Sequence, residues 1–215
     1  MKLEDLRRQY SGQTVLHRKD LLADPIQQFE RWLKEAVDSG ITDPTAMSLA
    51  TVDSGLQPSQ RTVLLKHVDA KGFVFYTNTD SRKAREIAAN HKVSLLFAWL
   101  PLNRQVIING TAEKLSIKDV FNYFVTRPKD SRLAAWASQQ SHPISSRQLL
   151  EQQFEAMKQK FADGKIPVPP FWGGYRISPS SIEFWQGQEQ RLHDRFRYRK
   201  DSNDPSNWII ERLAP

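Results

Sequence analysis

The hydrophobic period of this chain changes near residue 46, and that change constrains the possible folds more than any other feature. Residues 25–40 have the apolar spacing of an amphipathic helix, with Asp24 as its N-cap and Gly40 as its stop. From Ala46 to Ala112 the apolar residues follow the spacing of strands instead. The apolar stripe expected on the helix consists of Ile26, Phe29, Leu33 and Val37.

Strands rich in Val, Ile, Leu and Phe are expected in both halves of the chain. In the first half they are Ala46–Val52, Ser59–Val68, Gly72–Thr77, Val93–Trp99 and Gln105–Glu113. In the second half they are Gly174–Ile177, Ile182–Trp185, Arg191–Arg199 and Trp208–Arg212. The helices expected between them are Ser81–Asn90, Ile117–Thr126, Ser131–Ser138 and Arg147–Ala162. Because strands and helices do not alternate regularly, the pattern predicts a mainly β fold with inserted helices (α+β), an antiparallel barrel decorated by helices.

The length of 215 residues fits one domain of ordinary size. Residues 1–23 are basic and weakly periodic, so we interpret them as a flexible N-terminal arm that orders on binding a ligand. Residues 24–215 are expected to form a single domain, because strands resume after the proline-rich connector near residue 168.

Composition excludes several classes of protein. The chain has no cysteine, which excludes disulfides, Cys-based zinc sites and Cys nucleophiles, and its five His residues lack paired metal-ligand spacing. Neither nucleotide-binding glycine fingerprint is present. No apolar run is long enough to span a membrane and no signal peptide is evident, so a cytoplasmic location is expected.

The chain carries a net charge of +7, with 31 Lys and Arg against 24 Asp and Glu. Such an excess is compatible with solubility, with nucleic-acid binding, or with cations reserved for small phosphorylated ligands. The positions of the charges have to distinguish these readings.

The most informative charges are Arg82 and Lys83, at the start of an expected helix. Cations there oppose the helix dipole, which favours negative charge at that end. A phosphate bound at the helix N-terminus would account for them. A solvated helix start with two incidental charges is the alternative.

Two strands also carry unexpected cations. Strict alternation along the second strand would point Arg61 and Lys66 to opposite faces, and both can be structural. In the eighth strand the alternating cations would share one face and repel one another unless an anion or carboxylates neutralise them. That face would hold Arg191, His193, Arg195, Arg197 and Arg199. Either a binding site or a solvated edge strand explains it.

A weaker signal comes from Tyr123 and Arg127, four residues apart on one helix face, with Ser131 just beyond. Tyr, Arg and Ser side chains together can hold a phosphate. Packing of Tyr123 in the core is the alternative.

These segments, taken together, resemble one family. Arg61–Lys66, Phe75–Asn78, Ser81–Lys83 and Ser94–Phe97 are similar to the flavin-binding half of the pyridoxamine 5′-phosphate oxidases. The C-terminal half resembles that family's signature in four segments, Phe171–Arg176, Ile182–Gly187, Arg191–Arg195 and Glu211–Pro215. The resemblance runs from about residue 3 to the last residue.

The resemblance implies a split β-barrel homodimer with FMN bound at the subunit interface. It implies an FMN site lined by Arg61, Thr62, Val63, Leu64, Leu65, Lys66, Tyr76, Thr77, Arg82, Lys83, Gln105, Gln140, Ser141, Trp185 and Arg195. Two phosphorylated ligands, FMN and the substrate, would then account for two groups of cations without any nucleic acid.

The resemblance also implies a substrate site. Residues expected to bind the substrate phosphate are Lys66, Tyr123, Arg127 and Ser131. Arg191 and His193 would lie over the pyridine ring as the catalytic pair, with Leu192 between them, and Arg7 and Tyr10 would cover the substrate. Gln188-Glu189-Gln190 departs from the family, where Gly and His are frequent at these positions. The resemblance therefore does not define that wall of the pocket.

The activity implied is oxidation of pyridoxamine or pyridoxine 5′-phosphate to pyridoxal 5′-phosphate, a step of vitamin B6 metabolism, with O2 as acceptor and H2O2 as product. No metal, membrane or nucleic-acid partner is expected. One alternative is another split-barrel flavoprotein with a different substrate. A second is a binding module without catalysis, either a pyridoxal-phosphate carrier or a nucleic-acid binder.

Overall fold

The fold is given by a computed structural model that describes residue 2 and residues 14–204 and 206–215. Arg7 and Tyr10 lie outside this described part of the chain. The strands are β1 (Ala46–Val52), β2 (Pro58–Leu64), β3 (His67–Asp69), β4 (Gly72–Asn78), β5 (Lys92–Trp99), β6 (Arg104–Lys114), β7 (Trp172–Gln186), β8 (Asp194–Lys200) and β9 (Trp208–Leu213). The helices are α1 (Pro25–Asp38), α2 (Arg82–Ala89), α3 (Ile117–Thr126), α4 (Lys129–Ala137) and α5 (Arg147–Lys160), and short 3-10 turns cover Arg18–Asp20, Leu100–Leu102 and Glu189–Arg191.

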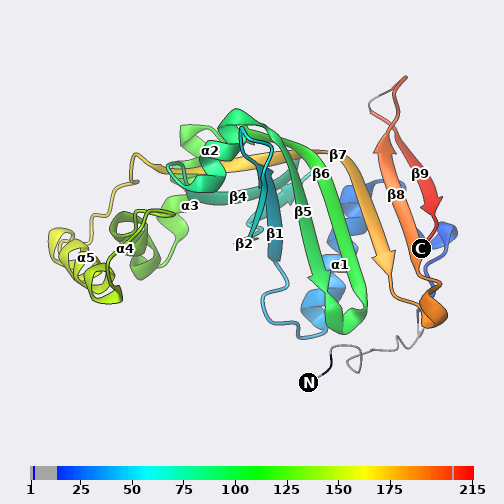
Figure 1. The fold of residues 1–215 in the computed structure, drawn as a ribbon, viewed down its shortest axis with the longest axis horizontal. Coiled ribbons are helices and arrows are strands. Elements are labelled where there is room, and N and C mark those ends of the chain that lie inside the picture. The colour runs from blue at the N-terminus through cyan, green and yellow to red at the C-terminus, as the bar shows by residue number, and fades with distance from the viewer. Residues whose placement is uncertain (1, 3–13, 205) are drawn as a thin grey trace.

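The strands form one nine-stranded sheet in which every pairing is antiparallel. The order is β2-β1-β5-β6-β7-β4-β3, and β8 and β9 extend from the far part of β7. Figure 1 shows the sheet curling into a half-barrel with α1 against it. The prediction of a mainly β, antiparallel barrel with inserted helices is confirmed.

Helix α1 fills the curl of the sheet because its apolar face is aromatic. The Phe29 ring lies 4.9 Å from the rings of both Phe73 and Phe97, and the Trp32 ring lies 5.1 Å from that of Phe184. The predicted stripe was partly wrong, since Val37 is 53% exposed while Trp32 is buried. Burial of these side chains anchors strands from both halves of the sequence to one helix.

Strand β7 connects the two parts of the sheet. It is one strand of 15 residues, whereas the sequence predicted two separate strands, because a register shift at Asn109 and Gly110 of β6 accommodates the bend near Pro179. Its first half pairs with β4 and its second half with β8. The two ends of β7 therefore pair with different strands of the sheet.

The segment before α1 also packs on the sheet. Leu16 and Leu21 are buried in the main core, and the Leu16 N–H donates to Asp194 at 3.0 Å. On the other side of the molecule, α4 and α5 form a separate lobe (Figure 1). A small apolar cluster at its base contains Phe124, Leu133, Phe161 and Ile166.

Candidate functional site

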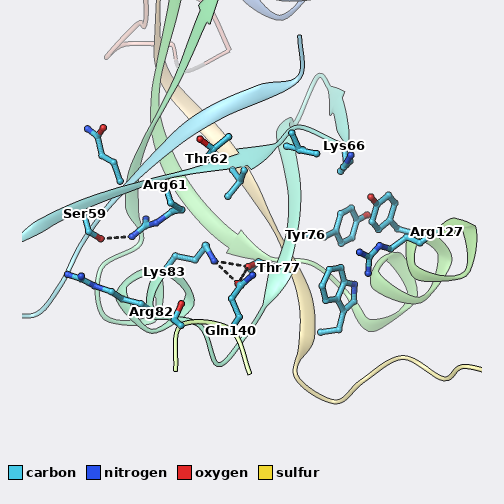
Figure 2. Close-up of a pocket in the computed structure, with 16 residues that line it drawn as sticks. Ser59, Arg61, Thr62, Lys66, Tyr76, Thr77, Arg82, Lys83, Arg127 and Gln140 are labelled. Carbon is cyan, nitrogen blue, oxygen red and sulfur yellow. Dashed lines mark hydrogen bonds between the residues drawn. The ribbon is translucent and has the colours of Figure 1, made fainter. Parts of the chain in front are cut away.

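A cavity of about 540 Å³ opens between β2, β4, α2 and α3. The loop after α4 and the first residue of β7 complete its wall. Its lining residues are Ser59, Gln60, Arg61, Thr62, Val63, Leu64, Lys66, Tyr76, Thr77, Arg82, Lys83, Tyr123, Arg127, Gln140, Ser141 and Trp172. In Figure 2 the cations form two groups, Arg61 with Arg82 and Lys83 at one end, and Lys66 with Arg127 at the other.

Within the first group of cations, Lys83 is buried and held by hydrogen bonds. Its ammonium group donates to Gln140 Oε1 at 2.7 Å and to Thr77 Oγ1 at 3.1 Å (Figure 2). Burial, together with the nearby Arg61 charge, lowers the pKa of Lys83 to about 8. A buried ammonium and a guanidinium repel each other, and an anion bound nearby would offset this repulsion.

The start of α2 adds donors to this end of the cavity. Ser81 is the N-cap, but its hydroxyl donates to Asn78 O at 2.7 Å rather than capping the helix. The first N–H groups of a helix have no partner within it and carry the positive end of its dipole. Three cations and a helix N-terminus therefore lie together at this end of the cavity.

The second group of cations lies beside three aromatic side chains. The Tyr76 and Tyr123 rings are stacked with centroids 3.8 Å apart, and the Arg127 guanidinium lies 4.2 Å from the Trp172 ring centre. Burial lowers the pKa of Arg127 and raises that of Tyr123. Tyr123 therefore lines the cavity wall rather than the core.

Two donors at this end lack an acceptor. Arg127 Nη1 and Trp172 Nε1 are buried without a hydrogen-bond partner among the residues that the structure describes. A buried N–H without an acceptor is unfavourable by about 1–3 kcal/mol, and both atoms belong to residues that line the cavity.

Lys66 reaches the same cavity as Arg61, contrary to the prediction that they point to opposite faces. Strand β2 ends at Leu64, and the next two N–H groups bond to different partners, Leu65 to Thr45 O and Lys66 to Val74 O. Because the chain bends there, strand alternation does not extend to Lys66. Leu65 points into the core instead and is only 5% exposed.

A second cluster lies on β6, β7 and β8. Gln105 is paired with Trp185, and Trp185 with Arg195, across adjacent strands. The His193 ring lies 4.7 Å from Trp185, and Arg195 pairs with Glu183 at 2.9 Å. None of these residues lines the cavity described above.

The predicted strand of alternating cations was partly wrong. Strand β8 begins only at Asp194, since Gln190 and Arg191 have left-handed φ values of 53° and 63°. Arg191, Leu192 and His193 therefore precede the strand. The Arg195, Arg197 and Arg199 side chains do share a face, and carboxylates neutralise them, with Glu211 bound to the last two.

His193 is held in one orientation. The Gln188 N–H donates to its Nδ1 at 3.0 Å, so the neutral ring carries its proton on Nε2. Burial and the neighbouring Arg191 charge lower its pKa below the usual value. The ring is thus neutral at physiological pH.

The cavity and the second cluster lie at opposite ends of β7. Trp172 begins the strand and lines the cavity, whereas Trp185, next to the last residue, belongs to the cluster. Thirteen residues of strand give a contour length of roughly 40 Å. Figure 1 shows the strand running from the helical lobe to the β8 side of the molecule.

The residues predicted from the sequence did not include three that line the cavity. Ser59, Gln60 and Trp172 line the cavity, and period-two spacing from Arg61 would have found Ser59. Ser131 lies in the first turn of α4, outside the lining. Within the described part of the chain, no cluster of His, Asp or Glu has metal-ligand geometry, and no helix has the length and apolarity to cross a membrane.

Comparison with known proteins identifies the family. A family model described as pyridoxamine 5′-phosphate oxidase matches residues 33–161, and one described as the pyridoxine 5′-phosphate oxidase C-terminal dimerisation region matches residues 172–215. The chain belongs to the pyridoxamine 5′-phosphate oxidase family. A pyridoxine/pyridoxamine 5′-phosphate oxidase of Hahella chejuensis is 59% identical over the full length of both chains, and one of Vibrio cholerae is 58% identical, again over both full lengths.

Solved structures agree with this family on the fold. PhzG from Burkholderia lata, in complex with tetrahydrophenazine-1-carboxylic acid, superposes with a TM-score of 0.87 at 30% identity, covering 96% of this chain and all of its own. An FMN-binding protein of Nostoc punctiforme, described as related to pyridoxamine 5′-phosphate oxidase, has a TM-score of 0.70 at 15% identity, covering 91% of this chain and all of its own. The pyridoxamine 5′-phosphate oxidase family therefore gives both the sequence relatives and the architecture.

Proposed function

We propose that this chain oxidises pyridoxamine 5′-phosphate and pyridoxine 5′-phosphate to pyridoxal 5′-phosphate, using FMN as cofactor and O2 as acceptor, with H2O2 as the second product. The observation that carries the proposal is one cavity with two separate groups of cations, which suits two phosphorylated ligands. Full-length relatives at 57–59% identity are named for this activity.

The FMN phosphate is assigned to Arg61, Arg82, Lys83 and the start of α2. These groups supply three cations and helix N–H donors at one end of the cavity. Thr62, Val63, Leu64, Tyr76, Thr77, Gln140 and Ser141 line the same cavity and would contact the rest of the cofactor. When bound, FMN supplies a two-electron acceptor that dioxygen can reoxidise.

The substrate phosphate is assigned to Lys66, Tyr123 and Arg127. Arg127 Nη1 and Trp172 Nε1 are the buried donors that lack acceptors, and phosphate oxygens would satisfy both. We add Trp172 to the predicted set on this ground. Ser131 stays in the proposal as a residue that follows Arg127 closely, at the start of α4. Binding by the phosphate positions the reacting carbon.

The other residues predicted for the FMN site belong to the second cluster, and we assign them to the FMN site of the partner subunit. Gln105, Trp185 and Arg195 lie on paired strands near the end of β7 that is opposite the cavity, and they do not line this chain's own cavity, so a homodimer would complete each site. The match to a dimerisation region over residues 172–215 supports this arrangement. Leu192 is 65% exposed in the single chain, as a residue that contacts a partner or substrate would be.

The catalytic roles are assigned to Arg191 and His193. With Nδ1 occupied by the Gln188 N–H, His193 presents Nε2 to the substrate and can exchange a proton there. Arg191 would fix the face of the pyridine ring, and Arg195 would stabilise negative charge on the flavin side of the site. The proposal for Arg7 and Tyr10, as residues that cover the substrate, concerns the part of the chain outside the description.

The test uses the full chain loaded with FMN under anaerobic conditions. Pyridoxamine 5′-phosphate should bleach the visible flavin absorption, and readmitted air should restore it with release of pyridoxal 5′-phosphate and H2O2. Pyridoxamine without its phosphate is the matched control and should bleach the flavin much more slowly. A protein that binds FMN but is not bleached by either vitamer would contradict the proposal.

A flavoprotein with another substrate is the second candidate. PhzG shares the fold, and its solved complex holds a carboxylic acid rather than a phosphorylated vitamer. The second group of cations favours a phosphorylated substrate here, since Lys66, Tyr123 and Arg127 line the cavity together.

A further inference from the structure

We infer that Glu86 is a positioning residue, which orients the guanidinium groups of Arg61 and Arg82 for the phosphate of the flavin. The inference rests on the proposed function. Glu86 lies on α2, does not line the cavity, and belongs to none of the predicted site residues. It therefore acts on the ligand only through other side chains.

Both carboxylate oxygens of Glu86 are fully used. Oε1 accepts from Arg82 Nε at 2.6 Å, and Oε2 accepts from Ser59 Oγ at 2.7 Å, from Arg61 Nη2 at 3.1 Å and from Thr51 Oγ1. Only 4% of its side chain is exposed. These hydrogen bonds lower the pKa of Glu86 to about 2 despite burial, so it is ionised at every physiological pH.

The hydrogen bonds leave the outward-facing atoms of Arg82 available. Glu86 accepts only from the Nε of Arg82, so neither terminal amino group of Arg82 is bound to this carboxylate. The Arg82 side chain is 53% exposed, and an exposed arginine that is not held in this way samples many rotamers. Holding one conformer in advance removes that entropy loss from ligand binding.

Arg61 is fixed at more points. Its Nη1 donates to Leu49 O at 3.1 Å and to Thr51 Oγ1, and its Nη2 is shared between Ser59 and Glu86. Thr51 and Ser59 each contact both Arg61 and Glu86. Glu86 is thus the common acceptor of a network that ends at two cations of the cavity.

The charges explain why a carboxylate can stand so close to an anion site. Arg61, Arg82 and Lys83 carry three positive charges and Glu86 one negative charge, a sum of +2, which matches a phosphate dianion. By itself the Glu86 charge repels the phosphate. Removing that charge should therefore weaken FMN binding if Glu86 mainly orients the arginines, and strengthen it if Glu86 mainly repels the phosphate.

The experiment compares Glu86→Gln with wild type in equilibrium binding of FMN and of riboflavin, which lacks the phosphate. If Glu86 orients the arginines, FMN binds about tenfold or more weakly in the variant, while riboflavin affinity changes less than about twofold. If repulsion dominates, FMN binds more tightly, which overturns the inference. Equal loss for both flavins means a general folding defect and also overturns it.

Glu151→Gln is the matched control. It removes an equal charge from another Arg–Glu pair four residues apart on a helix, Arg147–Glu151, far from the cavity, and should leave both affinities unchanged. Should Glu86→Gln not fold, Glu86→Asp keeps the charge but shortens the side chain, and weaker FMN binding with unchanged riboflavin binding is again expected. FMN binding equal to wild type in Glu86→Asp would then overturn the inference.

A double variant shows whether Glu86 acts through Arg82. In an Arg82→Met background, the Glu86→Gln change should weaken FMN binding by a clearly smaller factor than in wild type. An undiminished factor contradicts the positioning role. If wild type itself binds no FMN, the proposed function fails with the inference, whereas normal FMN binding by Glu86→Gln removes the inference alone.

Discussion

Arg127 combines two features at the scale of a single residue. Its guanidinium packs on the Trp172 ring, and one of its buried amino groups has no acceptor in the described part of the chain. A side chain held by an aromatic face, with a donor left over, is prepared to bind an anion. This feature leads to the first prediction.

Arg127→Ala should raise the KM for pyridoxamine 5′-phosphate by about 30-fold or more, as loss of a charge-assisted contact to phosphate implies. FMN affinity should stay within about twofold of wild type, because Arg127 lies at the opposite end of the cavity from Lys83. Steady-state kinetics and flavin titration measure the two effects. Arg147→Ala, on exposed α5, is the control, and an unchanged KM in Arg127→Ala would remove this residue from the phosphate site.

Lys83 gives a prediction about pH. Burial lowers its pKa to about 8 in the protein without ligand, below its unfolded value, so the charged form is the disfavoured one. The ammonium is present below pH 8 and is lost above it. A phosphate in contact would hold the proton, so binding should take up a proton above pH 8.

FMN affinity should therefore fall about tenfold between pH 7 and pH 9, with one proton linked to binding. In Lys83→Met the affinity should be lower at pH 7 and nearly independent of pH over this range. Fluorescence titration of the flavin measures both. A wild-type affinity that is flat with pH, or a Lys83→Met variant that keeps the slope, would contradict the assignment.

The same linkage fixes the sign for stability. Because the pKa of Lys83 is lowered by folding, the unfolded chain binds more protons between the two pKa values. Charged Lys83 therefore destabilises the fold, and this penalty decreases as pH rises from about 8 toward the pKa of the unfolded chain. As pH rises above 8, FMN affinity is thus expected to fall while the stability of the fold increases. The proposed function would thus depend on a charge that the fold disfavours.

Sequence alone located most of the cavity at the residue scale. Arg61, Arg82 and Lys83 were visible as cations in positions that their local structure does not explain, and the family resemblance supplied most of the other lining residues. Trp172 was not assigned a role, because the feature that suggests one is a buried Nε1–H without an acceptor. Such a feature depends on the packing of the folded chain and is not visible in the sequence. Glu86 was overlooked for a similar reason, since a carboxylate on a short helix looks like a surface residue until its four donors are in place.

At the scale of elements, the turn between β3 and β4 depends on one glycine. Gly72 has a φ of +122°, and an added Cβ would lie 2.0 Å from the carbonyl oxygen of Ile177 on β7. Both the backbone conformation and the close approach of β7 require the absence of a side chain. Gly40, which ends α1 with a φ of +75°, has open space around it.

Gly72→Ala should therefore lower the free energy of unfolding by roughly 3 kcal/mol or more, and Gly40→Ala by about 1 kcal/mol. Urea denaturation of the cofactor-free chain, followed by far-UV circular dichroism, measures both. Equal effects in the two variants would mean that the contact with β7 is unimportant and that only backbone conformation matters.

Element boundaries show where periodicity stops being informative. Four of the five strands of the first half were predicted almost as observed, because half-buried strands alternate clearly. The exception is the predicted strand Ser59–Val68, which is two strands, β2 and β3, because the chain bends after Leu64. The start of β8 was placed three residues too early, since Arg191, Leu192 and His193 continue the alternation in sequence while left-handed residues interrupt it in the backbone. That error concerns the two residues proposed to be catalytic.

At the scale of the whole molecule, the proposal requires two chains for each site. The cavity of one chain and the second cluster of its partner would face one bound flavin. Variants in the two parts should then complement each other, which a single-chain site cannot do.

Heterodimers of Lys83→Ala and Arg195→Ala chains, purified through two different tags, should recover about half of the wild-type activity, because one of two sites is intact. Heterodimers of Lys83→Ala and Arg61→Ala place both changes in the same part of the site and should stay inactive. Activity assays with saturating FMN decide the matter. No recovery in the first pair would mean that each chain builds its own site.

The length of β7 has a consequence for the enzyme in dilute solution. Since this strand keeps the cavity and the second cluster of one chain apart, subunit dissociation and loss of the flavin would be two aspects of one equilibrium. Adding FMN would then hold the dimer together, and dilution would release it. A cell that makes little of this protein would keep it assembled only while its flavin supply lasts.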